Sequence, residues 1–394
     1  MNDTIVVTTS ETRTPSRVVR RADFGGRQLW WEIAGPEEAL PGPLIRHDLA
    51  ATSLAFFAMH QGASLRIDGP VSRSLLQNLE DFVACWSMWR PDIYQRIEIT
   101  AAEELDDYLE DDHTRTRAVA AFSGGVDGSF TLLRHVRKDV GRRTRDLIAG
   151  VLIHGMDIAL ENTSAFEVAK TTAQASLSSL SVPLAVVRTN WKEFAVDWEM
   201  EFGTAISSAL RNWQGSAATG LLGSDEDYAS LVLPWGGNPL SYSMLSTPNF
   251  TVVYDGGEYT RTDKVEYLSQ WDEGLRSLRV CWAGPKTGHN CGACEKCLRT
   301  KLNFMAVGAE LPPSLSGAPS IRQIVGIRAR NSVQVSYLNE IILVASQRGI
   351  KAQWVLALRG AMIKNRLMNR LRHLVILRAL WRPLKSAMKA LAGR

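Results

Sequence analysis

Apolar and polar positions alternate in a regular way through the middle of the chain. Short apolar runs, which predict buried strands, lie at residues 117–122, 147–154 and 183–188. Longer segments with apolar residues at helical spacing separate them, one led by Phe130, Leu132, Leu133 and Val136 and the other spanning 159–180. This alternation predicts an α/β fold with a doubly wound parallel sheet and helices on both faces. Ligands of such sheets bind at the carboxyl ends of the strands.

The first part of the chain shows a different mixture of elements. Strands are predicted at 28–33, 64–68 and 97–99, and a helix with its apolar face on Leu75, Leu76, Leu79, Phe82, Val83 and Trp86 is predicted to end before Pro91. The acidic stretch 103–112 is read as a boundary. Residues 1–115 are therefore expected to form an N-terminal α/β accessory domain, and no catalytic constellation is visible in it.

Beyond Pro312 and Pro313 the pattern becomes helical and basic. An apolar stripe, with Pro383 kinking or dividing it, consists of Leu367, Leu371, Leu374, Leu377, Trp381, Leu384, Met388 and Leu391. We expect a basic amphipathic helical region over 311–394. Packing on the protein's own body or in a homo-oligomer is the first interpretation, and an acidic partner, RNA or an anionic membrane surface are the others.

Composition and charge are those of a multi-part globular protein. The 394 residues are 45% hydrophobic and 22% charged, which suits a large core. The net charge of +4 hides an asymmetry, because residues 341–394 hold twelve Lys or Arg and no acid, which leaves 33 basic against 41 acidic residues before them. The amino terminus has no apolar signal core and no apolar stretch reaches membrane-spanning length, so a cytoplasmic location is expected.

The most informative motif lies between the first central strand and its helix. It reads Ser123, Gly124, Gly125, Val126, Asp127, Gly128, Ser129. Backbone N–H groups at a glycine-rich turn, together with the positive end of a helix, can surround an anionic oxygen when no Cβ intervenes. The serines add hydroxyl donors, and Asp127 could hold magnesium or orient a phosphate. The spacing matches neither the dinucleotide fingerprint nor the Walker loop, and the alternative is an ordinary glycine turn.

Four of the five cysteines cluster late in the chain. Cys281 is followed by Cys291, Cys294 and Cys297, and two residues between successive cysteines allow their sulfurs to reach one ion. Zinc in a closed tetrahedral site is the favoured interpretation, with a disulfide pair and an iron–sulfur cluster as alternatives. Cys85, among Phe82, Val83 and Trp86, is expected to be core packing.

His154 ends the second central strand. The ring could face a ligand at the carboxyl edge of the sheet, or it could be a packed histidine without chemistry.

The loop resembles the Ser-Gly-Gly-x-Asp-Ser motif of the N-type ATP pyrophosphatases, the PP-loop superfamily, which split ATP between the α and β phosphates and pass AMP to a substrate oxygen. The serine that follows the aspartate in that family is Gly128 here. Loop and cysteines together resemble the 7-cyano-7-deazaguanine synthase family over residues 116–308, within an expected PP-loop domain of 116–310. The resemblance implies ATP, Mg²⁺ and a structural Zn²⁺ as cofactors, Lys264 as a phosphate contact and Arg299 as the family's arginine.

The resemblance also implies a reaction. An ATP-dependent carbon–nitrogen ligase of this type adenylates a carboxylate or amide oxygen, and an amine or ammonia then displaces AMP to give an amide, or a nitrile if the cycle repeats. The family's substrate-pocket residues are absent, since residues 153–158 and 223–228 read differently here. The acceptor is therefore a small or a macromolecular substrate of unknown identity. A tRNA-modifying PP-loop enzyme and a catalytically decayed nucleotide-binding module are the two alternatives.

Overall fold

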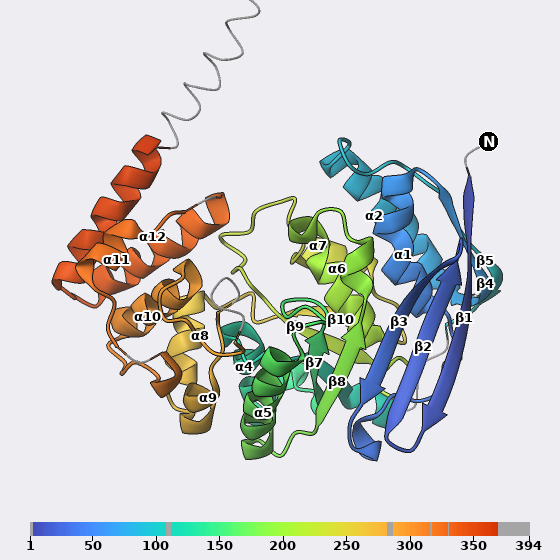
Figure 1. The fold of residues 1–394 in the computed structure, drawn as a ribbon, viewed down its shortest axis with the longest axis horizontal. Coiled ribbons are helices and arrows are strands. Elements are labelled where there is room, and N and C mark those ends of the chain that lie inside the picture. Colours follow the sequence, from blue (N-terminus) through green and yellow to red (C-terminus); the bar gives the residue numbers. More distant parts are fainter. Residues whose placement is uncertain (1–2, 108–111, 282–286, 316, 330, 369–394) are drawn as a thin grey trace, which may run out of the picture.

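A computed structural model describes residues 3–107, 112–281, 287–315, 317–329 and 331–368 of the chain (Figure 1). Its strands are β1 (Thr4–Thr14), β2 (Arg17–Phe24), β3 (Arg27–Ala34), β4 (Ser64–Ser72), β5 (Ile99–Leu105), β6 (Arg117–Ala121), β7 (Asp146–His154), β8 (Leu184–Thr189), β9 (Thr219–Gly223) and β10 (Thr251–Asp255). They form one ten-stranded sheet in the order β10-β9-β6-β7-β8-β3-β2-β1-β4-β5.

The helices lie between and after these strands. They are α1 (Asp48–Gln61), α2 (Arg73–Trp89), α3 (Asp112–Thr116), α4 (Val126–Val136), α5 (Thr163–Ser179), α6 (Trp198–Arg211), α7 (Pro239–Met244), α8 (Arg261–Leu268), α9 (Asp272–Ser277), α10 (Glu295–Val307), α11 (Ile321–Gly326) and α12 (Ser332–Gln347), followed by a helix over 353–368. None of the described helices has both the length and the apolar character that crossing a membrane requires.

The central strands β10, β9, β6, β7 and β8 are parallel, and both of their faces are buried. Val119 and Val151 point into a cluster shared with α1 and α6, whereas Ala120 and Leu152 point into a cluster shared with α5. Alternate residues of a strand face opposite sides, so helices must cover both. This confirms the predicted α/β class with a mostly parallel sheet between helices.

Two predicted boundaries near these strands were wrong. The helix predicted from residue 159 begins at Thr163, where the Asn162 side chain accepts a hydrogen bond from Ala165 N. The strand predicted at 97–99 begins at Ile99 and continues to Leu105, through part of the acidic stretch. Because β5 is an edge strand that pairs only with β4, the exposed Glu103 and Glu104 cost it little.

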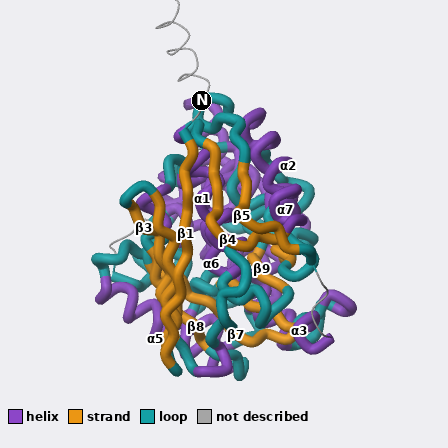
Figure 2. The backbone as a smooth tube through the Cα atoms, turned by 90° about the vertical axis from the view of Figure 1, so that its right-hand side faces the viewer, coloured by secondary structure: helices purple, strands orange, loops and turns teal. Residues whose placement is uncertain are grey.

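The N-terminal strands continue the same sheet. Antiparallel pairing of β3 with β8, from Trp31 opposite Thr189 to Ala34 opposite Val186, joins them to the central strands. Strand β1 is divided: Thr4–Val7 pairs with β4 and Thr8–Thr14 with β2. In Figure 2 these strands form the near side of the molecule. The expected domain boundary at 115 thus falls between two strands of one sheet and remains a prediction.

The C-terminal helices form a small bundle beside α10 (Figure 1). Leu298, Leu302, Ile341, Leu358 and other apolar residues of α10, α11, α12 and helix 353–368 make a cluster of their own. Of the predicted apolar stripe, Leu367 lies on helix 353–368 and is 55% exposed. The stripe residues from Leu371 onward and Pro383 lie outside the described residues.

Candidate functional site

The glycine-rich loop turns the chain from β6 into α4 at the carboxyl edge of the central strands. Phe122 N donates to Val151 O at 2.8 Å and completes the sheet, and Gly124 then adopts φ of +77°, which favours glycine. Gly125 is the N-cap of α4, and in the described part of the chain no side chain caps this end. The first-turn N–H groups are therefore free of side-chain acceptors. Ser123 is exposed, whereas Val126 and Ser129 are buried.

Gly128 stands where the resembled family has serine, and the packing explains why. A Cβ at this position would lie 2.9 Å from Ala121 O, and one at Gly223 would lie 2.5 Å from the backbone carbon of Asp127. The first turn of α4 is thus pressed against β6 and the end of β9. Glycine at these two positions allows that approach.

A second segment runs along the outer side of the loop. Arg279 N donates to Gly124 O at 2.8 Å, and Arg279 Nε donates to Ser123 O at 3.1 Å. Arg279 is 9% exposed, and burial lowers its pKa from the usual arginine value. These bonds place a guanidinium beside the loop, two residues before Cys281.

Asp127 lies in the first turn of α4 and faces a group of cations. Arg261 NH1 donates to its Oδ2 at 2.9 Å, and Lys264 Nζ lies 3.7 Å from its Oδ1. Burial raises the pKa of Asp127, but Arg261, Lys264, Lys296 and Arg299 outweigh burial and hold the pKa below its usual value. Asp127 is therefore a carboxylate, and its Oδ1 has no hydrogen-bond donor among the described residues.

Lys264, the predicted phosphate contact, is bonded inward. Its Nζ donates to Ser224 O at 2.5 Å and to Ser224 Oγ at 2.6 Å, just after β9. Burial lowers the pKa of Lys264. Arg261, one turn earlier on α8, makes the direct contact with Asp127, and the sequence analysis missed it. A pair of basic residues three apart at a helix start was the signal, since such residues share one face.

The same spacing recurs on α10 with Lys296 and Arg299. Lys296 is half-buried, and its side chain makes no hydrogen bond or ion pair within the described residues. Arg299, predicted as a site residue, is 5% exposed, donates from Nε to Glu295 Oε1 at 2.8 Å, and lies over the Tyr337 ring at 4.3 Å. Its NH1 has no acceptor in the described structure. Lys296 was missed by the sequence analysis.

His154 is a packed histidine, as the second of its two interpretations expects. Its ring stacks on Phe166 at 4.0 Å, its Nε2 bonds to Ala159 O at 3.0 Å, and it is 1% exposed. Burial lowers its pKa, so the ring is neutral. The remaining Nδ1 has no partner among the described residues. Nothing in these contacts turns the ring toward the loop.

A half-buried carboxylate after β9, Asp225, was not singled out from the sequence. Trp235 Nε1 donates to Asp225 Oδ2 at 2.6 Å, and Tyr337 OH donates to Asp225 O at 2.8 Å. Burial raises the pKa of Asp225, and the nearby Asp127 adds to that effect. Aromatic side chains from the loop after β9 and from α12 therefore both bond to Asp225, and Tyr337 also lies against Arg299 of the cationic group.

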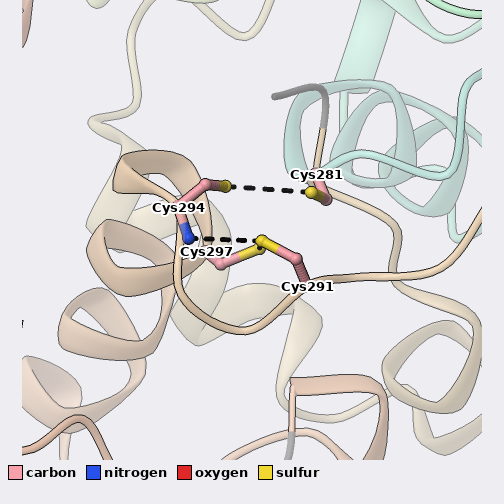
Figure 3. Close-up of side chains that lie close together, drawn as sticks. All are labelled: Cys281, Cys291, Cys294 and Cys297. Carbon is pink, nitrogen blue, oxygen red and sulfur yellow. Dashed lines mark hydrogen bonds between the residues drawn. The ribbon is translucent and has the colours of Figure 1, made fainter. Parts of the chain in front are cut away.

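The four predicted cysteines meet at the start of α10 (Figure 3). Their sulfurs all lie within 4.8 Å of one another, with Cys281 and Cys294 at 3.8 Å and Cys291 and Cys297 at 4.0 Å. None of the four forms a disulfide in the structure, so the disulfide alternative has no support there. A tetrahedral ion with metal–sulfur bonds of about 2.3 Å separates its sulfurs by about 3.8 Å. The cluster could therefore bind a metal ion such as zinc.

The local structure around the cysteines favours metal binding. Cys294 is the N-cap of α10, its backbone N–H points to Cys291 Sγ at 3.2 Å, and the hydrogen bond from Cys297 lowers the pKa of Cys294 to about 5. Asn290 Oδ1 accepts from Val280 N and Cys281 N. The cluster thus ties the segment carrying Arg279 to the helix carrying Lys296 and Arg299.

The site therefore combines a glycine-rich turn, the carboxylate of Asp127 and five nearby cations, namely Arg261, Lys264, Arg279, Lys296 and Arg299. Glu295 is paired with Arg299, and Asp225 lies close to Asp127 and Lys264. Such a group suits a ligand with several negative charges. Neither a family model, nor a curated protein, nor a solved structure matches the chain.

Proposed function

We propose that the chain is an AMP-forming, ATP-dependent carbon–nitrogen ligase of the PP-loop type that resembles 7-cyano-7-deazaguanine synthase. The observation that carries the proposal is the unpartnered cation Lys296 beside a carboxylate and a glycine-rich helix start. A structural salt-bridge network would pair its members, whereas this one has more positive than negative groups next to the loop. A polyphosphate supplies the missing negative charge.

In this proposal, the loop and the cations together bind the phosphates of ATP. Backbone N–H groups of the first turn of α4 and the Ser123 hydroxyl donate to the β and γ phosphates, while Lys296, Arg279 and Arg261 balance their charge. Asp127 Oδ1, which no donor occupies, fits a ligand position for Mg²⁺. Magnesium, when bound, would neutralise phosphate charge and so favour pyrophosphate as the leaving group.

The proposed reaction has two steps. An acceptor carboxylate or amide oxygen attacks the α phosphorus, the bond to the bridging oxygen of the β phosphate breaks, and pyrophosphate leaves. With a carboxylate acceptor, an amine or ammonia then attacks the activated carbon, and AMP departs with the carbon–oxygen bond electrons while the amine loses a proton. With a primary amide as acceptor, no amine is needed: the amide nitrogen loses its protons, AMP departs and a nitrile forms. The cations stabilise the charge on the departing pyrophosphate, and the loop orients the α phosphorus.

Zn²⁺ is the ion proposed for the cysteine cluster, with a structural role. Sulfur separations of 3.8 and 4.0 Å suit one ion, whereas the irons of a cubane cluster would spread the thiolates farther apart. Four thiolate ligands leave no open coordination position for a substrate.

The test uses the full chain and α,β-methylene-ATP, an analogue that cannot be cleaved between the α and β phosphates. Calorimetric titration with Mg²⁺ present should give saturable binding. Lys296→Gln, which removes a cation that no described side chain pairs with, should weaken binding by about tenfold, equivalent to about 1.4 kcal/mol. Lys170→Gln, on the exposed surface of α5, is the matched control and should bind like the wild type.

Chemistry is tested with ATP itself. Asp127→Asn keeps an oxygen for Arg261 but removes the charge, and should abolish AMP and pyrophosphate release in a screen of acceptors with ammonia. No magnesium-dependent heat with the analogue would refute the proposal. Binding without AMP release from any acceptor would instead favour the non-catalytic nucleotide-binding module.

A further inference from the structure

Helix 353–368 has two apolar faces, and only one of them is covered. Leu358, Met362 and Val355 are buried in the bundle with α12, and Asn365 fixes the helix by accepting from Ala329 N at 3.2 Å and donating to Ile327 O at 2.9 Å. On the opposite side, Leu356 is 68%, Ile363 60% and Leu367 55% exposed. The described structure leaves this second face to solvent.

The exposed residues form a narrow stripe. At about 100° per residue, Leu356, Ile363 and Leu367 fall within about 40° of one another around the helix axis. We call these three residues the aliphatic stripe. Gly360 lies next to it with no atom within 4 Å of its Cβ position, so the surface there is open and flat. Three large aliphatic side chains in one row are an unusual solvent face for a helix.

Cations line both sides of the aliphatic stripe. Arg359 and Arg366 follow one side and Lys364 follows the other, all three exposed. Lys364 Nζ donates to Val325 O at 3.0 Å and Arg359 NH2 to Ser346 Oγ at 2.9 Å, so both charges are held beside the helix without a carboxylate. Residues 341–394 contain twelve Lys or Arg and no acid.

We propose that this face of helix 353–368 docks on an anionic lipid surface, with the aliphatic stripe among the acyl chains and the flanking cations at the headgroups. Aliphatic side chains between two rows of bases are the pattern of helices that lie in a membrane interface. The helix would meet this surface along its length, because the aliphatic stripe runs along its axis.

Other occupants fit the face less well. Single-stranded RNA binds through stacking on aromatic side chains, and the aliphatic stripe has none. A second copy that docked through the same face would bring cations against cations, because residues 353–368 include no acid. Residues 369–394, with seven further bases and no acid, offer no counter-charge either. An anionic bilayer supplies both the apolar interior and the opposite charge.

The experiment is co-sedimentation of the full chain with vesicles of phosphatidylcholine alone and of phosphatidylcholine mixed with phosphatidylglycerol. We expect binding to the mixed vesicles, weakened by salt, and at least about tenfold weaker partitioning to phosphatidylcholine alone. The triple variant Leu356→Gln, Ile363→Gln, Leu367→Gln should lose at least about tenfold of the partitioning to mixed vesicles. Circular dichroism checks that the variant folds.

Ile45→Gln is the matched control, since Ile45 is 63% exposed, as Ile363 is, but lies before α1. It should partition like the wild type. Equal partitioning of the triple variant and the wild type would overturn the proposal. A wild type that binds neither kind of vesicle would also overturn it. In that case, a lower mass in solution or a lower affinity for RNA in the triple variant would identify a second copy or RNA as the occupant instead. Binding of α,β-methylene-ATP is measured separately, so failure here leaves the proposed function untouched.

Discussion

At the scale of single residues, Gly128 shows how packing can override a motif. The resembled loop carries serine there, but this chain brings α4 so close to β6 that a Cβ would lie 2.9 Å from Ala121 O. The neighbouring atom is backbone and cannot rotate away. Glycine at position 128 therefore allows this close approach of the helix to the sheet.

Gly128→Ser is accordingly expected to destabilise the protein, by about 1–3 kcal/mol in the free energy of unfolding, because the backbone must shift to admit the new atom. Urea unfolding measures the change. Gly360→Ser is the control: a Cβ at this helical position meets nothing within 4 Å, so we expect no loss and a small gain in stability. A Gly128→Ser protein as stable as the wild type would show that α4 can move away from β6.

Glu226 is a second residue whose environment has a measurable consequence. It is 2% exposed, Val232 N donates to its Oε2 at 3.2 Å, and its Oε1 lacks a partner in the described structure. Burial raises its pKa to about 7. The folded protein therefore holds this proton more tightly than the unfolded chain, in which the pKa is near 4.5.

The sign of the pH effect follows from linkage. The free energy of unfolding should fall as pH rises from about 4.5 to 7 and stay low above it, with a loss of at most about 3 kcal/mol from this group. Glu226→Gln should remove that part of the slope, which urea titrations at pH 5 and pH 8 would reveal. The exposed Glu161→Gln should leave the slope unchanged. An unaltered slope in Glu226→Gln would mean that this carboxyl is already ionised at low pH.

At the scale of elements, the cysteine cluster links two segments that the loop needs. Arg279 lies two residues before Cys281 on one segment, and Lys296 lies two residues after Cys294 on α10. Both cations are placed by the backbone that the cysteines hold together. Metal content and phosphate affinity should therefore change together.

Cys294→Ser is expected to lower the bound metal well below one ion per chain and to weaken α,β-methylene-ATP binding by at least about tenfold, since metal and fold are coupled. Elemental analysis and calorimetry are the measurements. If the variant does not fold, the same two measurements are made on wild-type protein from which a chelator has removed the metal. Cys85→Ser, away from the cluster, should change neither quantity. Full affinity for α,β-methylene-ATP after metal removal would show that nucleotide binding does not depend on the cysteine cluster.

Sequence pattern predicted some elements and not others, for physical reasons. Strands β6, β7 and β8 are continuous apolar runs, as buried parallel strands are. The spacing of the cysteines can likewise be read directly from the sequence. Strand β9 was not predicted because Gly220 and Gly223 weaken the strand signal. Both are needed for space, since a Cβ on Gly220 would lie 2.9 Å from the Phe250 ring. Arg261 and Lys296 were missed because a basic residue at a helix start is ordinarily solvated.

At the scale of the whole molecule, the ten-stranded sheet makes the two halves interdependent. One apolar cluster includes Leu29 and Trp31 of β3 together with Val187 of β8 and Leu210 of α6. Trp213 Nε1 donates to Ala39 O at 2.8 Å across the same contact. The sequence showed two kinds of pattern on either side of residue 115 and could not show that their edge strands pair, because pairing of distant strands has no local signature.

Native-state hydrogen exchange tests whether this contact unites the halves. Amides of β3 and β8 should exchange with one common free energy of opening, because each strand protects the other along the ladder. Mass spectrometry of fragments at increasing urea gives that energy for each strand. If β1 to β3 exchanged first while β6 to β9 stayed protected, the predicted boundary near residue 115 would describe two separate folding units.

The C-terminal bundle also takes part in the site. Tyr337 donates to Asp225 O, and Glu340 Oε1 accepts from Thr262 N at 2.8 Å, so α12 fastens both the loop after β9 and the first turn of α8. Both of these hydrogen bonds therefore come from one helix, α12. A protease cut between α11 and α12 would leave α12 held to the rest of the protein by these two hydrogen bonds and by packing. Nucleotide bound at the proposed site should therefore slow that cut, because it would steady the first turn of α8, to which α12 is bonded.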